Sequence, residues 1–384
     1  MAEKFDVCVL GGGIVGHTLA LLLARERLRV GLVSKAVAQG NQRDDVRAYA
    51  LNHQSRELLE GLRCWPDDSH VTAVLDMHVQ EAGAARVHFN AAGSGAGALA
   101  WIVDVPALES QLAQALRFEP RIVLLAGAVP AALTVVCEGR SSAARTRFGV
   151  EQDLTPYAQS AIAARVRCEM AHQQAAHQWF ATGDILGLLP LDGAMGNTMA
   201  LVWSVDDRLR DDLLACSAES FAQRLQLASS GQLGRMELVS ERQNWPLQMA
   251  VARQWSGTDE GRAWVLAGDA AHVVHPMAGQ GLNLGLADAQ ELAAQVHARD
   301  YWRPVDDRHM LRRYERARKA DALTMATATD GLQQLFARPG GGWHRVRNWG
   351  MRGFDRSDTL KRWVARRAMG IGFGATSHTA DRTI

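Results

Sequence analysis

Cysteines are few in this sequence and are not arranged in pairs. The 384-residue chain contains five of them without a CxxC motif, which argues against a disulfide framework or a zinc site and favours a reducing compartment. Long hydrophobic runs are also missing. The longest nearly apolar stretch, Ile14–Ala24, is too short to cross a bilayer, and the N-terminus is unlike a signal peptide. The formal net charge of +1 offers no bulk attraction for nucleic acid. We therefore expect a cytoplasmic protein of two or three domains, soluble or peripherally attached to a membrane.

Glycine, in contrast, is abundant, and in two stretches its spacing predicts a binding site. The first follows the short apolar run Phe5–Leu10, where Gly11, Gly13 and Gly16 are spaced as GxGxxG before a segment of helical period. In a strand–turn–helix of this kind, Gly11 makes the turn, Gly13 lets a pyrophosphate approach the backbone, and Gly16 lets helix and strand pack closely. This pattern predicts binding of FAD or NAD.

The second stretch predicts a buried strand, a glycine-rich loop and a helix. Residues 264–267 are apolar on both sides, as in a parallel sheet, and Asn283 is a good N-cap for the amphipathic segment that follows. A strand-end carboxylate can accept hydrogen bonds from sugar-like hydroxyls, and glycines let a planar ligand lie on bare backbone. The candidate cofactor-binding residues here are Gly268, Asp269, Pro276, Gly279, Gly281, Leu282 and Asn283.

Residues 268–288, read as GDAAHVVHPMAGQGLNLGLAD, resemble the second flavin motif of a known enzyme family. That family is the FAD-dependent aromatic-ring hydroxylases of the para-hydroxybenzoate hydroxylase type, and the similarity is strongest to the ubiquinone-biosynthesis group. The resemblance extends over residues 5–370 and identifies FAD as the expected cofactor. It implies that NAD(P)H reduces the flavin, that O2 adds at flavin C4a, and that the hydroperoxyflavin hydroxylates a polyprenyl phenol.

The resemblance also implies an α/β fold with a Rossmann-like FAD-binding domain, an inserted antiparallel-sheet substrate domain and C-terminal helices. The periodicity of the chain alone predicts a doubly wound dinucleotide-binding domain interrupted by an antiparallel sheet. We expect the FAD-binding domain to comprise residues 1–70, 101–150 and 251–330. The substrate domain is expected over 71–100 and 151–250, and a basic helical segment over 331–384.

Several positions depart from the family pattern. Ser34 stands where an acidic residue usually binds the adenosine ribose. Residues 137–145 resemble the family's G-A-D-G-x-x-S-x-x-R motif, with Glu138 in place of its aspartate. Residues 118–136 are too few for the three-stranded meander of relatives. Arg47, in contrast, matches a D-x-R-x-x-A-L segment whose arginine lies beside the cofactor, although a surface arginine is the competing interpretation. Ser34 therefore predicts weaker adenosine binding, unless other contacts hold FAD normally.

The remaining chemical candidates are histidines. His272 and His275 with Asp269 could be read as a metal cluster, but HxxH in a loop without a third histidine is a weak pattern, and we predict no metal. His275 is the one catalytic candidate, as a proton relay to the substrate phenol, while a structural, hydrogen-bonded histidine is the alternative.

Two other functions remain compatible with the sequence. One is a flavoprotein dehydrogenase that inserts no oxygen. The other is a catalytically weakened relative that binds a polyprenyl phenol and scaffolds a quinone-biosynthesis complex, which the departures at Ser34 and Glu138 would favour.

Residues 338–367 contain nine Lys/Arg and two acidic residues, a net charge of +7 in a chain whose total is +1. Tryptophans are interleaved with these charges, as in helices that lie at a membrane surface. A basic cap that packs on acidic residues of the main body is the competing interpretation.

We expect the protein to bind anionic vesicles in a salt-sensitive manner, because each base near such a surface contributes about 1 kcal/mol. Co-sedimentation at low and high salt measures this, with Lys361, Arg362, Arg366 and Arg367 changed to Ser as the variant. Equal partition onto neutral and anionic vesicles, or no binding to either, would favour the cap.

Overall fold

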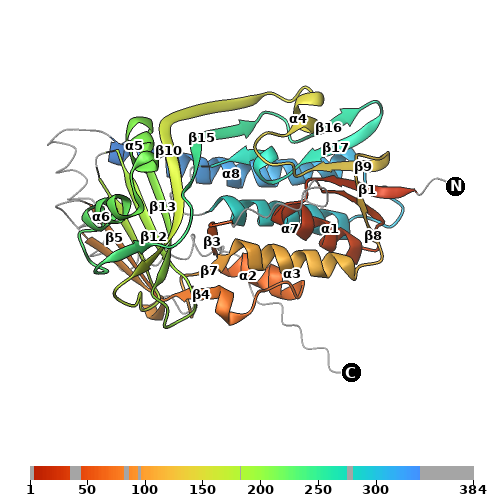
Figure 1. Ribbon diagram of the computed structural model, residues 1–384. Helices are drawn as coiled ribbons and strands as arrows, with labels where there is room; N and C mark the ends of the chain where they lie inside the picture. Colours follow the sequence, from red (N-terminus) through yellow and green to blue (C-terminus); the bar gives the residue numbers. More distant parts are fainter. Residues whose placement is uncertain are drawn as a thin grey trace.

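The chain folds around three β-sheets. The computed structural model describes residues 4–34, 45–81, 86–93, 97–181, 183–274 and 280–337. In Figure 1 a six-stranded sheet lies near the N-terminus and a nine-stranded sheet at the opposite end, with a small three-stranded sheet beside the helices between them. This mixed arrangement of parallel and antiparallel strands confirms the predicted α/β fold class.

The six-stranded sheet has a parallel core, and its central strands are largely buried on both faces. In β1 every residue but Asp6 is buried, and β17 is buried after its first residue. Only the edge strand β16 is antiparallel. The order across the sheet is β16 (Ser256–Asp259), β17 (Arg262–Leu266), β9 (Ala131–Val136), β1 (Phe5–Leu10), β2 (Val30–Val33) and β8 (Ile122–Leu125).

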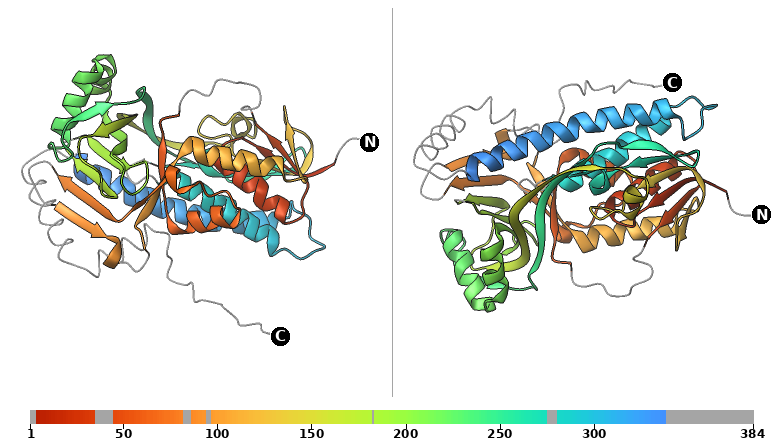
Figure 2. Two further views of the ribbon diagram at one scale, coloured as in Figure 1. Left: turned by 60° about the horizontal axis from the view of Figure 1, so that its bottom comes forward. Right: turned by 90° about the horizontal axis from the view of Figure 1, so that it is seen from above.

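Three helices form a layer beside this sheet, with α1 between α3 and α7. Helix α8 runs along the molecule from the six-stranded sheet toward the nine-stranded one, as both views of Figure 2 show. None of the helices in the described ranges combines the length and apolar character needed to span a membrane. The helices are α1 (Ile14–Arg25), α2 (His53–Gly61), α3 (Val105–Arg117), α4 (Ala143–Arg147), α5 (Asp207–Ala215), α6 (Ala218–Ala228), α7 (Gly281–His297) and α8 (Arg308–Ala337).

The nine-stranded sheet is antiparallel except where β11 pairs with β5. Its long strand β10 pairs with both β13 and β15, and helices α5 and α6 pack an apolar cluster against one face. The order is β18 (His272–Val273), β15 (Gln243–Ala252), β10 (Gln152–Cys168), β13 (Thr198–Asp206), β12 (Ile185–Pro190), β11 (Ala175–Phe180), β5 (Asp76–Glu81) and β6 (Arg86–Asn90), with β14 (Met236–Leu238) also on β10.

The three-stranded sheet connects these two parts. Its order is β3 (Ala48–Leu51), β7 (Ala100–Asp104) and β4 (Val71–Val74), and β7 leads directly into α3. A small apolar cluster joins it to the nine-stranded sheet through Val74, Ile102 and Ala200. This placement brings the start of α3 and the segment before β3 to the carboxyl ends of the parallel strands.

His17 in α1 gives the fold a pH dependence. Burial lowers the pKa of His17 from 6.5 to about 4, so the native protein keeps this ring neutral. The unfolded chain takes up the proton as pH falls below 6.5. The contribution of His17 to the free energy of unfolding is therefore complete above pH 6.5 and is lost as pH falls toward 4.

We predict that His17→Leu makes stability less sensitive to acid. Between pH 7 and pH 5 the wild-type protein should lose about 2 kcal/mol more unfolding free energy than the variant, because the native state excludes the proton over about 1.5 pH units. Urea unfolding at both pH values measures this. Other histidines titrate in both proteins and cancel in the difference, so equal losses would contradict the prediction.

Candidate functional site

The first glycine-rich turn is built as the sequence predicts. Gly11 has φ +123°, and a Cβ placed there would lie 2.2 Å from the carbonyl oxygen of Cys137. A Cβ on Gly16 would lie 2.0 Å from the Gly11 oxygen, so helix α1 can approach β1 only with glycine at this position. Gly13 is the N-cap of α1 and faces open space. Its helix end has no side-chain cap, which leaves N–H groups available for an anion.

The second segment places a carboxylate at the end of β17. The chain leaves the strand through the short turn Gly268–Ala270, where Gly268 has φ +62° and donates its N–H to Asp288 at 2.8 Å. The Asp269 side chain that follows is open toward the space in front of the sheet. A strand-end acid is therefore presented beside the Gly11 turn, as the pattern predicts.

The expected N-cap role of Asn283 is wrong. Helix α7 begins at Gly281 with Gln280 as its N-cap, so Asn283 lies within the first turn and is buried. Its amide donates to the Ala50 carbonyl at 2.9 Å, and its oxygen accepts from the backbone N–H of Asn52 at 3.0 Å. The side chain thus fixes the α7 N-terminus against β3 and α2 instead of ending the helix.

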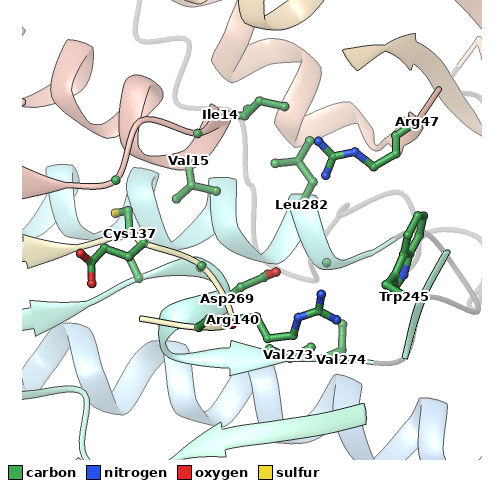
Figure 3. Close-up of a pocket in the computed structure, with 18 of the residues that line it drawn as sticks. Ile14, Val15, Arg47, Cys137, Arg140, Trp245, Asp269, Val273, Val274 and Leu282 are labelled. Atoms are coloured by element: carbon green, nitrogen blue, oxygen red, sulfur yellow. The ribbon is translucent and has the colours of Figure 1, made fainter. Parts of the chain in front are cut away.

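These segments enclose a cavity of about 820 Å³. Figure 3 shows Arg47, Asp269 and Trp245 reaching it from three different elements. The cavity extends from the glycine turn to strand β15 of the nine-stranded sheet. Its wall comprises residues 11–15, Val33, Arg47, Tyr49, Glu109, residues 137–141, Ala143, residues 243–248, residues 267–269, Val273, Val274, Gly281 and Leu282.

The predicted site residues fall into three groups. Those in the cavity wall are Gly11, Gly13, Arg47, Gly268, Asp269, Gly281 and Leu282. Gly16, Ser34 and Asn283 lie behind the wall, where they support the backbone. His275, Pro276 and Gly279 lie outside the described residues.

The cavity wall carries two arginines, Arg47 and Arg140, and three acids, Glu109, Glu138 and Asp269. The Arg47 guanidinium is held by Asp45, with its Nε 2.9 Å from Oδ1, and Arg140 donates to the Pro246 carbonyl at 3.3 Å. Burial opposes ionisation of Asp45, but the hydrogen bonds from Arg47 outweigh it and lower the pKa of this carboxyl. Asp269 is exposed to the cavity, yet desolvation by the surrounding protein raises its pKa, and His272 and the two arginines offset only part of that effect. The two arginines suit phosphate oxygens, which accept hydrogen bonds from the planar guanidinium.

Three wall residues and two supporting residues were not singled out from the sequence. Tyr49, Glu109 and Trp245 enter the cavity from separate elements. Tyr49 occupies an unspecified position of the D-x-R-x-x-A-L segment, and no motif contains Glu109 or Trp245. Asp288 and Arg318 form a buried ion pair behind Gly268, with Arg318 Nε 2.7 Å from Oδ1. The sequence does contain a signal for Asp288. It lies four residues from both Leu284 and Leu292, so it places a charged residue on the apolar face of α7.

The cavity suits a dinucleotide that carries a flat ring. A Cβ added at Gly13 or at Gly281 would meet no described atom within 4 Å, so bare backbone faces the cavity at both positions. The uncapped N-terminus of α1 and the two arginines suit a pyrophosphate. The α7 N-terminus at Gly281 likewise has no side-chain cap.

Comparisons with known proteins support this assignment. A family model described as an FAD binding domain matches residues 126–329. The ubiquinone hydroxylase UbiL of Rhodospirillum rubrum is 30% identical over 397 residues, covering 95% of this chain and 89% of that protein. The 3-demethoxyubiquinol 3-hydroxylase of Escherichia coli is 28% identical over 404 residues, with 96% and 99% covered.

Solved structures share the fold. PqsL from Pseudomonas aeruginosa, a probable FAD-dependent monooxygenase, has a TM-score of 0.74 at 20% identity and covers 91% of this chain and 100% of its own. The p-nitrophenol 4-monooxygenase PnpA from Pseudomonas putida has a TM-score of 0.75 at 17% identity, covering 97% and 100%. At these identities the likeness concerns the fold alone.

We predict that Gly281→Val weakens FAD binding by roughly tenfold or more, about 1.4 kcal/mol, because the added side chain occupies the space over the α7 N-terminus. Gly61→Val is the matched control, since Gly61 is also helical with no atom within 4 Å of an added Cβ but lies outside the cavity. Flavin fluorescence titration measures both. Wild-type affinity in Gly281→Val would exclude this surface as the flavin site.

Proposed function

Because the chain belongs to the FAD-dependent monooxygenase family that includes the ubiquinone hydroxylases, we propose that it hydroxylates the ring of a polyprenyl phenol intermediate of ubiquinone biosynthesis. NAD(P)H is the proposed electron donor, and O2 is the proposed source of the inserted oxygen atom. The similarity to these relatives spans nearly the whole chain, so the proposal concerns the complete activity and not one domain.

The observation that carries the proposal is the continuity of the cavity between two parts of the fold. One end is the glycine turn at Gly11 and Gly13, which suits the cofactor, and the other is β15, where Trp245 and Leu247 present apolar surface. A ring bound against Trp245 would lie next to the segment that begins at Gly281. The same space can therefore hold a flavin and an electron-rich aromatic ring side by side.

The side chains and backbone of this cavity bind and orient the cofactor and the substrate, while the cofactor provides the reactive chemistry. When bound, FAD supplies electron transfer from NAD(P)H and activation of O2. Asp269 accepts hydrogen bonds from cofactor hydroxyls, and the uncapped α7 N-terminus at Gly281 stabilises negative charge on the flavin edge. Trp245 and Leu247 exclude water from the substrate side.

We extend the proposal to the division of the chain. The six-stranded sheet and its helices hold FAD, whereas the nine-stranded sheet forms the substrate wall. A polyprenyl tail keeps its substrate in a bilayer, so the basic segment at residues 338–367, which lies outside the described residues, would bring the cavity to a membrane surface or to a quinone-biosynthesis complex.

The function is tested with purified, FAD-loaded protein, a short-chain polyprenyl phenol, NADH or NADPH, and ¹⁸O2. We expect one ¹⁸O atom in the ring product, detected by mass spectrometry, and NAD(P)H oxidation that accelerates with the phenol. A deletion strain should accumulate a quinone precursor one oxygen atom lighter than the product.

The outcomes that contradict this function identify its alternatives. NAD(P)H oxidation that yields hydrogen peroxide and no ring product, with any phenol tested, would indicate a flavoprotein without oxygen insertion. Retained binding of the polyprenyl phenol by a protein that fails to bind FAD would indicate a scaffold.

A further inference from the structure

The end of β2 offers no carboxylate to the cavity. Ser34 stands there, and its side chain is buried against the glycine turn, because a Cβ on Gly12 would lie 1.9 Å from the Ser34 hydroxyl oxygen. Val33, and not Ser34, belongs to the cavity wall. Two adjacent hydroxyls of a cofactor sugar are therefore without the acidic partner that usually accepts from them at this position.

A different carboxylate, that of Glu109, enters the cavity from α3. The buried face of this helix consists of Val105, Leu108, Leu112 and Leu116. Glu109 follows Leu108 and is one turn beyond Val105, so it lies at the border of the buried face and is part of the cavity wall. The start of α3 is fixed beside the arginine of the site, since the Val105 N–H donates to the Arg47 carbonyl at 3.4 Å.

The Glu109 carboxylate has no hydrogen-bond or ion-pair partner among the residues that the structure describes. Its charged neighbour Arg47 is engaged by Asp45, whose two oxygens accept from Nε at 2.9 and 3.0 Å. Burial raises the pKa of Glu109, and the charge of Arg47 offsets part of that rise. A half-buried carboxylate without a partner is unfavourable, so donors from a bound ligand would satisfy it.

We propose that Glu109 accepts hydrogen bonds from adjacent sugar hydroxyls of FAD and so offsets the acid missing at position 34. Such hydroxyls occur in the adenosine ribose and in the ribityl chain, and the chemistry that recognises them is the same. The inference concerns cofactor binding only and does not depend on which phenol the protein hydroxylates.

The test is Glu109→Gln in the full-length protein, which keeps the size of the side chain and removes its charge. FAD affinity, measured by flavin fluorescence titration at neutral pH, should fall roughly tenfold or more, since hydrogen bonds to a charged acceptor are replaced by neutral ones. Glu57→Gln is the matched control, because Glu57 lies on α2 with a 65% exposed side chain and should leave FAD affinity unchanged.

Two probes separate the sources of the hydroxyls. Weaker binding of ADP, with FMN unaffected, assigns Glu109 to the adenosine ribose, and the reverse assigns it to the ribityl chain. Either result supports the proposal. FAD affinity within twofold of wild type would overturn it, as would a loss of FAD affinity in which neither ADP nor FMN is affected.

A structural role is distinguished by a second variant and by the protein without flavin. Glu109→Asp keeps the charge and should retain part of the lost affinity. The urea unfolding midpoint of flavin-free Glu109→Gln should equal that of wild type, because the carboxylate has no described protein partner. A lowered midpoint together with no rescue by Asp would overturn the proposal.

Discussion

The hydrogen bonds of the Asp288 carboxylate are the interaction on which the site depends. This fully buried group accepts from the Gly268 N–H at 2.8 Å, from Arg318 at 2.7 Å, and pairs with His272 at 2.7 Å. It therefore ties the turn that presents Asp269 to helices α7 and α8. Burial opposes its ionisation, but the interactions with His272 and Arg318, hydrogen bonds included, outweigh that and lower the pKa of Asp288. Removing one partner of a buried pair typically costs about 3–5 kcal/mol, so this turn is held firmly from behind.

A second interaction couples the opposite side of the cavity to the nine-stranded sheet. Arg165 on β10 forms an ion pair with Asp104 and donates to the Asp45 and Val46 carbonyls at 3.2 and 3.4 Å. The segment it holds is the one that carries Arg47 into the cofactor cavity. Arg165 thus connects the nine-stranded sheet to the segment that carries Arg47. The two walls of the cavity are therefore not positioned independently.

Local patterns account for what the sequence could predict. The spacing of Gly11, Gly13 and Gly16 specifies a turn whose geometry needs only neighbouring residues, and the apolar run before Asp269 specifies a buried strand in the same way. The strand pairing that brings these two turns together is a consequence of the fold class, which the order of elements indicates. Hence the two glycine segments and their meeting at one cavity were predictable.

Long-range contacts account for what it could not. Asn283 is a good N-cap by type, yet its amide is used by Ala50 and Asn52, more than 200 positions away, and the helix begins two residues earlier. Glu109 reads as an ordinary helical glutamate, because its entry into the cavity is set by how α3 packs and not by its neighbours. In the sequence, Arg165 is likewise indistinguishable from the other polar residues that alternate with apolar ones along its strand. Such assignments require the distances between elements, which a single sequence does not contain.

The departure from the family pattern at Glu138 is accommodated by the surrounding structure. The Glu138 carboxylate accepts from the Ser142 hydroxyl and from the Ala144 N–H, both at 2.8 Å, so the longer acid holds the start of α4. Arg145 then donates to the Arg140 carbonyl at 3.0 Å and to the Ala270 carbonyl at 3.1 Å, which binds this motif to the Asp269 turn. The residues on both sides of the space in front of Gly11 are therefore fixed relative to each other. The altered motif therefore keeps the two sides of that space in a fixed arrangement, which a preorganised binding site requires.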